Sequence, residues 1–329
     1  MRSGLLALVF CSLLGQGVNA QSRLIIVSGI GGDPEYSERF YEWAVTLIDA
    51  ATQRHHVPLE HVTYLAERVE RDPDRIDGRA TKEAVESAFQ ALAREAGPNE
   101  MIHVVLIGHG STQGEESRFN LPGPDPTAED FDRLLDAFPT QRIVFVNAAT
   151  ASGGFVPVLS APNRIVVAAT KTGFERNEAI FGEYFVKAYA EDVADVDKDQ
   201  RVSVLEAFAY AVQEVRRVYE ADNRLLTEHA ILDDNADGEG STEPTIDGPD
   251  GSLAATSFLG VPRPTLVAGT ADSVLTALYE EKRVLEERIA ALRTRSDQLE
   301  QAEYERRLED LLVDLALKNR EIREREGGP

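Results

Sequence analysis

The chain has 329 residues, which is enough for one sizeable hydrophobic core and an accessory segment. Acidic residues outnumber basic ones by 57 to 34, and the formal net charge is −23. Such a surface repels phosphate backbones, so the composition argues against nucleic acid as a partner. It suits an exported protein or one that binds cations.

The first twenty residues are typical of a secretory signal peptide. Arg2 gives a basic start, the apolar stretch LLALVF follows, and Val18 to Ala20 end the segment with small side chains. We expect cleavage before Gln21 and export to a periplasm or to the outside. A retained anchor is the alternative, but the apolar stretch is too short to span a bilayer, so no membrane span is expected after removal.

Cys11 is the single cysteine, and it lies inside this leader. The mature chain therefore has no disulfide, no cysteine nucleophile and no thiolate metal ligand.

Strand and helix patterns alternate along residues 21–265. Strands are predicted at 23–28, 61–66, 101–111, 142–147 and 163–170, and helices at 35–51, 81–96, 128–138 and 178–190. Near-continuous apolar strands alternating with helices predict an α/β fold with a mostly parallel sheet covered by helices on both faces. Functional groups gather at the carboxyl ends of such strands, so we expect His109 and Thr150 to face one crevice.

The segments VVLIGHGSTQG (104–114) and VFVNAATASGG (144–154) resemble the two motifs of the legumain-like cysteine peptidases, within the caspase–hemoglobinase group. That family has His-Gly-Ser-Thr-Gly after one strand and Glu-Ala-Cys-Glu-Ser-Gly after the next. His109, Gly110, Ser111 and Thr112 match the first motif, Gly114 being displaced by one residue, and Ala149, Ser152 and Gly153 match the second. The resemblance covers about residues 23–190. It implies a caspase–hemoglobinase fold, with Gly110, Ser111, Ser152 and Gly153 bordering a peptide site.

The resemblance places Thr150 where the family has its catalytic cysteine. Upstream, SGIGGDPEYSE aligns with the family through Gly29, Gly32 and Tyr36. The supporting asparagine then becomes Glu35, and two residues of the specificity pocket become Ser37 and Glu38. Of the family's catalytic, supporting and specificity-pocket residues, His109 alone is retained. An alcohol needs an adjacent base, and the branched methyl of Thr150 fills space near the scissile carbonyl. We therefore expect a degenerate site, while a peptidase using Thr150 with His109 stays open, as does a purely structural role for His109.

Residues 195–206, DVDKDQRVSVLE, resemble an EF-hand loop. Asp195, Asp197 and Asp199 take positions one, three and five, Arg201 offers its carbonyl at position seven, and Glu206 takes position twelve. Gln200 stands where glycine normally makes the sharp turn. We expect calcium or another hard cation here, the alternative being an acidic loop that caps a helix.

A weaker echo occurs at residues 233–240. Asp233, Asn235 and Asp237 repeat the alternating oxygen pattern, but Pro244 occupies position twelve. A second calcium site and a plain Asx-rich turn are both compatible with this pattern.

The chain changes character after residue 265. Leu278, Leu285, Leu292 and Leu299 recur every seven residues, Leu308, Leu315 and Ile322 resume the repeat, and no proline or glycine interrupts 272–326. We predict one long amphipathic helix, or a hairpin broken near 297–304, within a helical tail at 266–329. Self-association through residues 272–326, packing back on the globular part, and an isolated helix are all open.

Three functions follow from these patterns. The first is an exported, inactive legumain-like protein that binds peptide or protein partners. The second is an active endopeptidase using Thr150 and His109. The third is a structural protein of the cell envelope that acts through its C-terminal helix.

Overall fold

The computed structural model describes residues 22–260, except 99, 115, 192 and 200, together with residues 273–293 and 300–325. The predicted signal peptide, residues 1–20, lies outside the described residues. In the part of the chain that is described, no helix has both the length and the apolar character needed to cross a bilayer.

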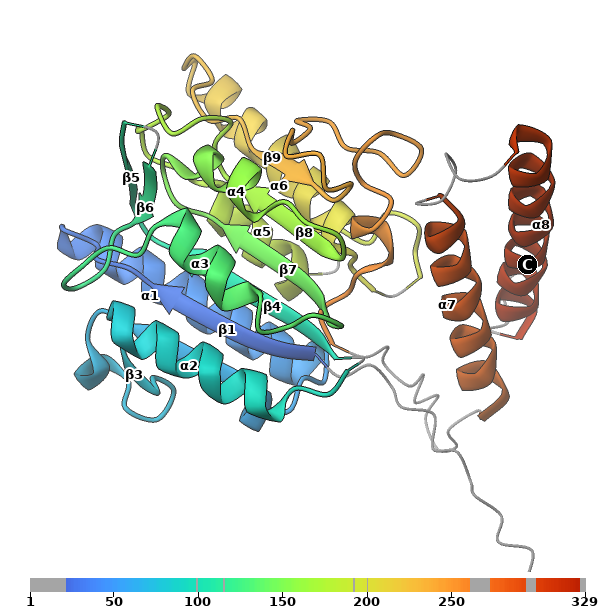
Figure 1. Cartoon of the computed structure of the whole chain (residues 1–329), viewed down its shortest axis with the longest axis horizontal. Helices are drawn as coiled ribbons and strands as arrows, with labels where there is room; N and C mark the ends of the chain where they lie inside the picture. The colour runs from blue at the N-terminus through green and yellow to red at the C-terminus, as the bar shows by residue number, and fades with distance from the viewer. Residues whose placement is uncertain are drawn as a thin grey trace, which may run out of the picture.

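A seven-stranded sheet forms the centre of the molecule, in the order β3-β2-β1-β4-β7-β8-β9 (Figure 1). Its strands are β1 (Ser22–Ser28), β2 (Val62–Ala66), β3 (Gly78–Arg79), β4 (Met101–Ile107), β7 (Arg142–Asn147), β8 (Arg164–Ala168) and β9 (Ile231–Asp233). All neighbours are parallel except β8 and β9. The predicted mostly parallel α/β sheet is confirmed.

Helices cover both faces of this sheet. One face carries α1 (Pro34–Asp49), α5 (Phe181–Ala190) and α6 (Val204–Ala221), and the other carries α2 (Lys82–Glu95), α3 (Ala128–Leu135) and the short α4 (Val156–Leu159). Successive side chains of β1 alternate between the two cores: Leu24 and Ile26 pack on the first face, Ile25 and Val27 on the second. Burial on both faces explains why the strands read as apolar runs.

One local expectation was wrong. The strand predicted at 101–111 ends at Ile107, and a separate antiparallel hairpin follows, formed by β5 (Gly110–Gln113) and β6 (Glu116–Phe119). The helix predicted over about 178–190 is confirmed as α5, which begins at Phe181. Its first amides are held by the distant carboxylate of Glu228, which accepts hydrogen bonds from Ile180 N at 3.0 Å and Phe181 N at 2.8 Å.

The C-terminal segment is a hairpin of two helices, α7 (Ser273–Arg293) and α8 (Gln301–Arg325), which lie side by side (Figure 1). This is one of the two predicted arrangements. On the side of the globular part, Lys282 of α7 lies 3.4 Å from Asp199 Oδ2. Figure 1 shows α8 on the far side of α7 from the sheet.

Candidate functional site

The parallel register of β4 and β7 brings the two predicted motifs to one edge of the sheet. Leu106 is paired with Asn147, and Ala148 N donates to Leu106 O at 2.9 Å. Gly110, which follows His109, donates a hydrogen bond from its backbone N–H to Thr150 Oγ1 at 3.2 Å. The two sequence motifs therefore adjoin, as their positions at strand ends predict.

Thr150 is buried at this edge, with 5% of its surface exposed. Its Oγ1 accepts a hydrogen bond from Gly110 N at 3.2 Å and donates to Gly110 O at 3.4 Å. The hydroxyl thus satisfies the backbone at the start of β5. To attack a substrate, the oxygen would have to leave the half-buried amide of Gly110 without its acceptor, which costs about 1–3 kcal/mol.

His109 is directed toward α1 rather than toward Thr150. Its ring packs edge-on against Tyr36, with centroids 4.8 Å apart, and against Phe40, at 5.1 Å. Burial lowers the pKa of His109, and this effect outweighs a hydrogen bond to the Gly31 backbone, which favours the protonated ring. Among the described residues, no hydrogen bond joins the His109 ring to Thr150.

The residues predicted to border a bound peptide form hydrogen bonds and close contacts with other residues of this chain. Ser111 Oγ donates to Asn120 Oδ1 at 3.0 Å. Ser152 is 1% exposed, and its Oγ accepts a hydrogen bond from Thr170 N at 3.2 Å. Gly153 N donates to Thr170 Oγ1 at 3.1 Å, and a Cβ on Gly153 would lie 2.3 Å from the carbonyl carbon of Lys171. The small side chains at this strand end allow the backbone near Thr170 and Lys171 to pack closely against it.

The segment that covers them is the loop at 170–176. Glu175 O accepts from Ala151 N at 2.9 Å, and Arg176 donates to Thr112 O at 3.0 Å, so the loop joins both motifs. Phe174, at its tip, is 76% exposed. The sequence motifs did not reveal this loop, and an aromatic residue within a polar segment was the available signal.

The positions matched to the family's specificity pocket have other partners. Ser37 Oγ donates to Glu67 Oε2 at 3.0 Å, and Glu38 forms an ion pair with Arg71. The cavity beside them holds about 20 Å³, the space of a single water. This hollow cannot accommodate an amino-acid side chain without rearrangement.

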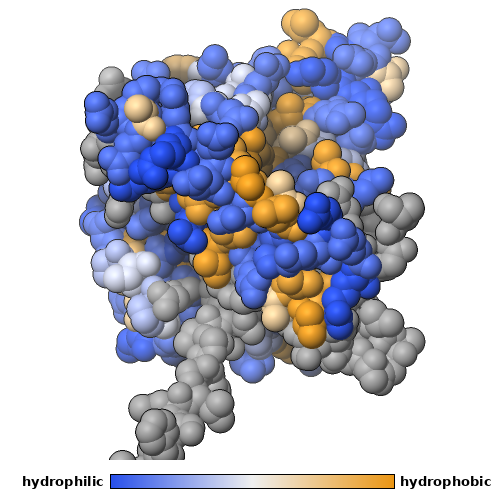
Figure 2. Space-filling model, turned by 90° about the vertical axis from the view of Figure 1, so that its right-hand side faces the viewer, coloured by the Kyte–Doolittle hydropathy of each residue, from blue (hydrophilic) through white to orange (hydrophobic). Residues whose placement is uncertain are grey.

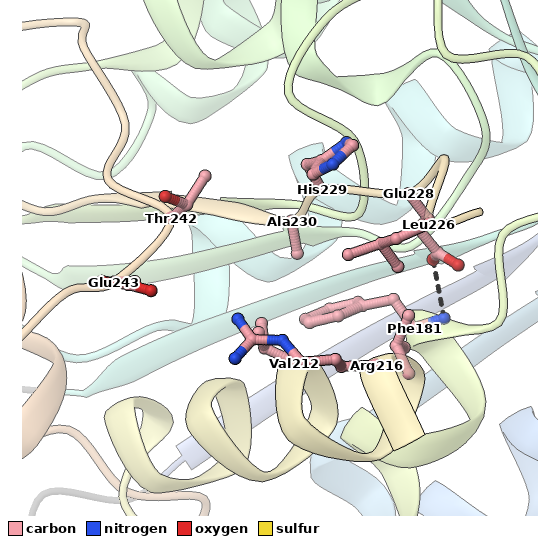
Figure 3. Close-up of a pocket in the computed structure, with 10 residues that line it drawn as sticks. Phe181, Val212, Arg216, Leu226, Glu228, His229, Ala230, Thr242 and Glu243 are labelled. Carbon is pink, nitrogen blue, oxygen red and sulfur yellow. Dashed lines mark hydrogen bonds between the residues drawn. The ribbon is translucent and has the colours of Figure 1, made fainter. Parts of the chain in front are cut away.

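A larger cavity of about 120 Å³ lies between α5, α6 and the segment before β9 (Figure 3). Phe181, Val212 and Leu226 give it an apolar lining, with Arg216 and Glu243 at one end and Glu228 near the other. Burial raises the pKa of Glu228 to about 7, although two backbone amides oppose the shift. Sequence analysis missed this cavity because its residues are far apart in the chain.

This cavity adjoins the loop at 170–176. His229 lines the cavity, and its Nδ1 lies within hydrogen-bond distance of Glu175 Oε1, at 3.1 Å. Its backbone N–H donates to the same carboxylate at 3.1 Å. Exposed Phe174 is the neighbour of Glu175 in sequence. The contact between Glu175 and His229 thus joins the loop to the cavity. We call these residues together the edge surface: Phe174, Glu175, Arg216, Leu226, His229 and Glu243.

The first calcium-type loop gathers its three aspartates. Oxygens of Asp195, Asp197 and Asp199 lie within 4.8 Å of one another. Asp199 N donates to Asp195 Oδ1 at 3.1 Å and to Asp197 Oδ1 at 3.0 Å, which holds the loop closed. Gln200, where the sequence predicted a strained turn, lies outside the described residues, and a positive φ of 59° occurs at Lys198.

Other members of this loop already have partners. Asp199 forms ion pairs with Arg201 at 2.9 Å and Lys282 at 3.4 Å. Glu206 accepts from Ser203 N at 2.9 Å and from Val196 N at 3.0 Å, so it caps α6. Burial raises the pKa of Glu206. A cation at the three aspartates would compete with the ion pairs of Asp199, and Glu206 would reach it only by turning from its cap.

The second loop is organised by its own backbone. Asp233 is fully buried and accepts from Gly238 N at 2.8 Å and from Ser160 Oγ at 2.9 Å. Asp237 Oδ1 accepts from Glu239 N at 2.7 Å, and Asn235 Oδ1 accepts from Asp237 N at 2.8 Å. These bonds form the Asx-type turns that were the alternative interpretation.

Comparisons with known proteins identify no family by sequence. No protein-family model matches the chain, and no curated protein matches it. Among solved structures, it is similar to caspase-1 from Spodoptera frugiperda, with 12% sequence identity and a TM-score of 0.42. That similarity covers 66% of this chain and 87% of the caspase chain.

Proposed function

We propose that the chain is an exported legumain-like protein of the caspase–hemoglobinase group that has lost peptidase chemistry and binds peptide or protein partners. The hydrogen bonding of Thr150 carries this proposal. Its hydroxyl is shared between the amide and the carbonyl of Gly110, at 3.2 and 3.4 Å. An alcohol becomes a nucleophile only when a base takes its proton, and the His109 ring is held against Tyr36 and Phe40.

The edge surface is where we place the partner. Phe174 offers an exposed aromatic ring, and the cavity offers an apolar lining beside Arg216 and Glu243. An apolar side chain of an extended peptide fits such a combination. The net charge of −23 favours a partner that is neutral or basic.

We expect the purified mature protein to leave a mixed peptide library uncleaved, across acidic to neutral pH and with calcium present. Thr150→Ala and His109→Ala should not change that result. Mass spectrometry of the library before and after incubation is the measurement. Cleavage that disappears in both variants would make Thr150 a nucleophile and overturn the proposal.

The same variants test the structural role of Thr150. Thr150→Ser keeps the hydroxyl, whereas Thr150→Val keeps the shape and removes it, so Gly110 N would lose its buried acceptor. We expect the valine variant to lose about 1–3 kcal/mol of unfolding free energy and the serine variant much less. Chemical denaturation measures both, and equal losses would contradict the assignment.

We also propose that the loop at 195–206 binds calcium in the extracytoplasmic space. The gathered oxygens of Asp195, Asp197 and Asp199 support this proposal. At ten to a hundred times a dissociation constant typical of extracellular sites, calcium should add about 1–3 kcal/mol to the unfolding free energy. Thermal unfolding of chelator-treated protein, with and without added calcium, measures the gain.

The matched variant is Asp195→Asn with Asp197→Asn, which leaves the ion pairs of Asp199 in place. The calcium-dependent rise in Tm should vanish in it, and magnesium should stabilise the unaltered protein less than calcium does. A rise of the same size in the variant would place the ion elsewhere. No rise in the unaltered protein would leave the loop as a helix cap.

A further inference from the structure

Helix α8 is apolar on more than one side. Leu308, Leu315 and Ile322 form the seven-residue repeat, and Leu311 lies between them on the same stripe. Leu311 and Ile322 are buried. On other sides of the same helix, Leu312, Val313 and Leu317 remain 42%, 52% and 44% exposed. A helix in a two-helix hairpin needs one apolar stripe, so the second has no partner within the hairpin.

Of these exposed residues, Val313 and Leu317 belong to a second stripe with its own heptad spacing. Arg306, Asp310, Val313, Leu317, Arg320 and Glu324 follow one another at intervals of 4, 3, 4, 3 and 4 residues. All six side chains are exposed. We call this stripe the outer seam. Its spacing is that of the contact positions of a coiled coil.

A groove runs beside the outer seam, between α7 and α8. It holds about 470 Å³ and is lined by apolar Val284, Leu285 and Leu317, with charged side chains around them. In Figure 2, which views the molecule from the side where Figure 1 shows α8, hydrophobic side chains form a broken band between hydrophilic ones. Apolar surface therefore extends from the seam into the groove, enough to receive another helix.

The charges of the outer seam indicate what that helix is. When two copies of α8 run antiparallel and are centred at the level of Leu315, Val313 of each lies opposite Leu317 of the other. Asp310 then lies opposite Arg320, and Arg306 opposite Glu324. Every charged position of the seam meets the opposite charge, and each pair occurs twice by symmetry.

The positions beside the seam also bring opposite charges together, with one exception. In this pairing, Arg307 of one copy comes near Glu321 of the other, which are again opposite charges. Asp314, however, approaches its own symmetry mate at the centre of the pairing. Like charges at such a position weaken association, so the contact should be reversible and sensitive to the charge at residue 314.

We propose that the outer seam of α8 binds a second copy of this chain in antiparallel orientation, joining two hairpins into a four-helix arrangement. Val313 and Leu317 form the centre of the contact, and the pairs Asp310–Arg320 and Arg306–Glu324 set its register. The proposal concerns the hairpin alone and does not depend on the function proposed for the edge surface.

Sedimentation velocity of the full mature chain over a series of concentrations tests this pairing. The unaltered protein should show a reversible dimer, and Leu317→Glu should remain a monomer. Asp310→Arg places arginines opposite each other twice, as Arg320→Asp does with aspartates. Each should raise the dissociation constant about tenfold.

Restoration of the pair is the decisive result. The double variant Asp310→Arg with Arg320→Asp should dimerise again, and an equimolar mixture of the two single variants should form the mixed dimer. The control Glu305→Arg changes the charge equally at an exposed position outside the seam and should leave the dimer intact. Circular dichroism confirms that each variant keeps its helices.

A monomer at all concentrations would overturn the proposal, because it would exclude a second copy of this chain as the partner of the seam. Dimers that respond equally to Glu305→Arg, or single variants that the double variant does not rescue, would exclude the antiparallel register. Asp314→Asn removes the like charges at the centre of the pairing, so it should lower the dissociation constant of the dimer. Weakening by that change would also contradict the pairing.

Discussion

Gly153→Ala should lower the free energy of unfolding by about 3 kcal/mol or more, the upper end of the cost of overpacking a core. An added Cβ would lie 2.3 Å from the carbonyl carbon of Lys171, 2.4 Å from its oxygen and 2.4 Å from Thr172 N. All three are backbone atoms, so no side chain can rotate away. The loop at 170–176 would have to lift from the strand end. Chemical denaturation of the two proteins measures the loss.

Gly97→Ala is the matched control. A Cβ there meets the side chain of Glu100 at 3.6 Å, an ordinary van der Waals contact. We expect it to change stability much less than Gly153→Ala does. If Gly153→Ala were equally mild, the loop would already be free to move, and the strand end would be accessible to a peptide.

Limited proteolysis distinguishes lifting of the loop from global unfolding. A protease that cuts after aromatic residues should cleave at Phe174 faster in the Gly153→Ala protein, at denaturant concentrations where the sheet is still folded. The buried contacts of Ser152 with Thr170 explain this expectation, because they would be lost together with the Gly153 contact.

The sheet could be predicted because its signals are local. Runs such as Ile143 to Val146 are apolar on both faces, and the structure buries them between two layers of helices. Thr81 caps α2 with its side-chain oxygen, as its position before an apolar-periodic segment indicates. Each of these signals lies within about one turn or one strand of the residue it specifies.

The candidate site was predictable only as far as its position. Two motifs at neighbouring strand ends placed His109 and Thr150 at one edge, and the structure brings these segments together. The sequence could not reveal that Thr150 serves the amide of Gly110, or that His109 packs on Tyr36. Those contacts span tens of residues and depend on side-chain directions that no spacing rule supplies.

The hairpin β5–β6 and the cavity around Glu228 were missed for a related reason. Gly110 was interpreted as the end of a strand motif, whereas it begins β5, which pairs with β6 across a tight turn. Glu228 belongs to none of the motifs found in the sequence. Its carboxylate accepts a hydrogen bond from the amide of Phe181, which lies 47 residues earlier in the chain at the start of α5.

That carboxylate should make the protein lose stability as the pH rises toward neutrality. Burial raises the pKa of Glu228 from 4.5 to about 7 in the folded protein. Below the unfolded value both states hold the proton. Between pH 4.5 and 7 the unfolded chain releases it while the folded protein keeps it, so the unfolded state is favoured progressively. The full loss, reached above pH 7, is about 3 kcal/mol.

Glu228→Gln removes this titration while keeping an oxygen that can accept from Ile180 N or Phe181 N. The unfolding free energy of the variant, minus that of the unaltered protein, should therefore rise between pH 4 and pH 8 and level off above the folded pKa. A constant offset reflects the altered cap of α5 and carries no information on titration. Glu175 and Glu178 also raise the pKa of Glu228 and remain in both proteins, so their own titration largely cancels in the difference. A difference that stayed flat with pH would mean that Glu228 is already ionised when buried, held by the two amides of α5 despite its desolvation.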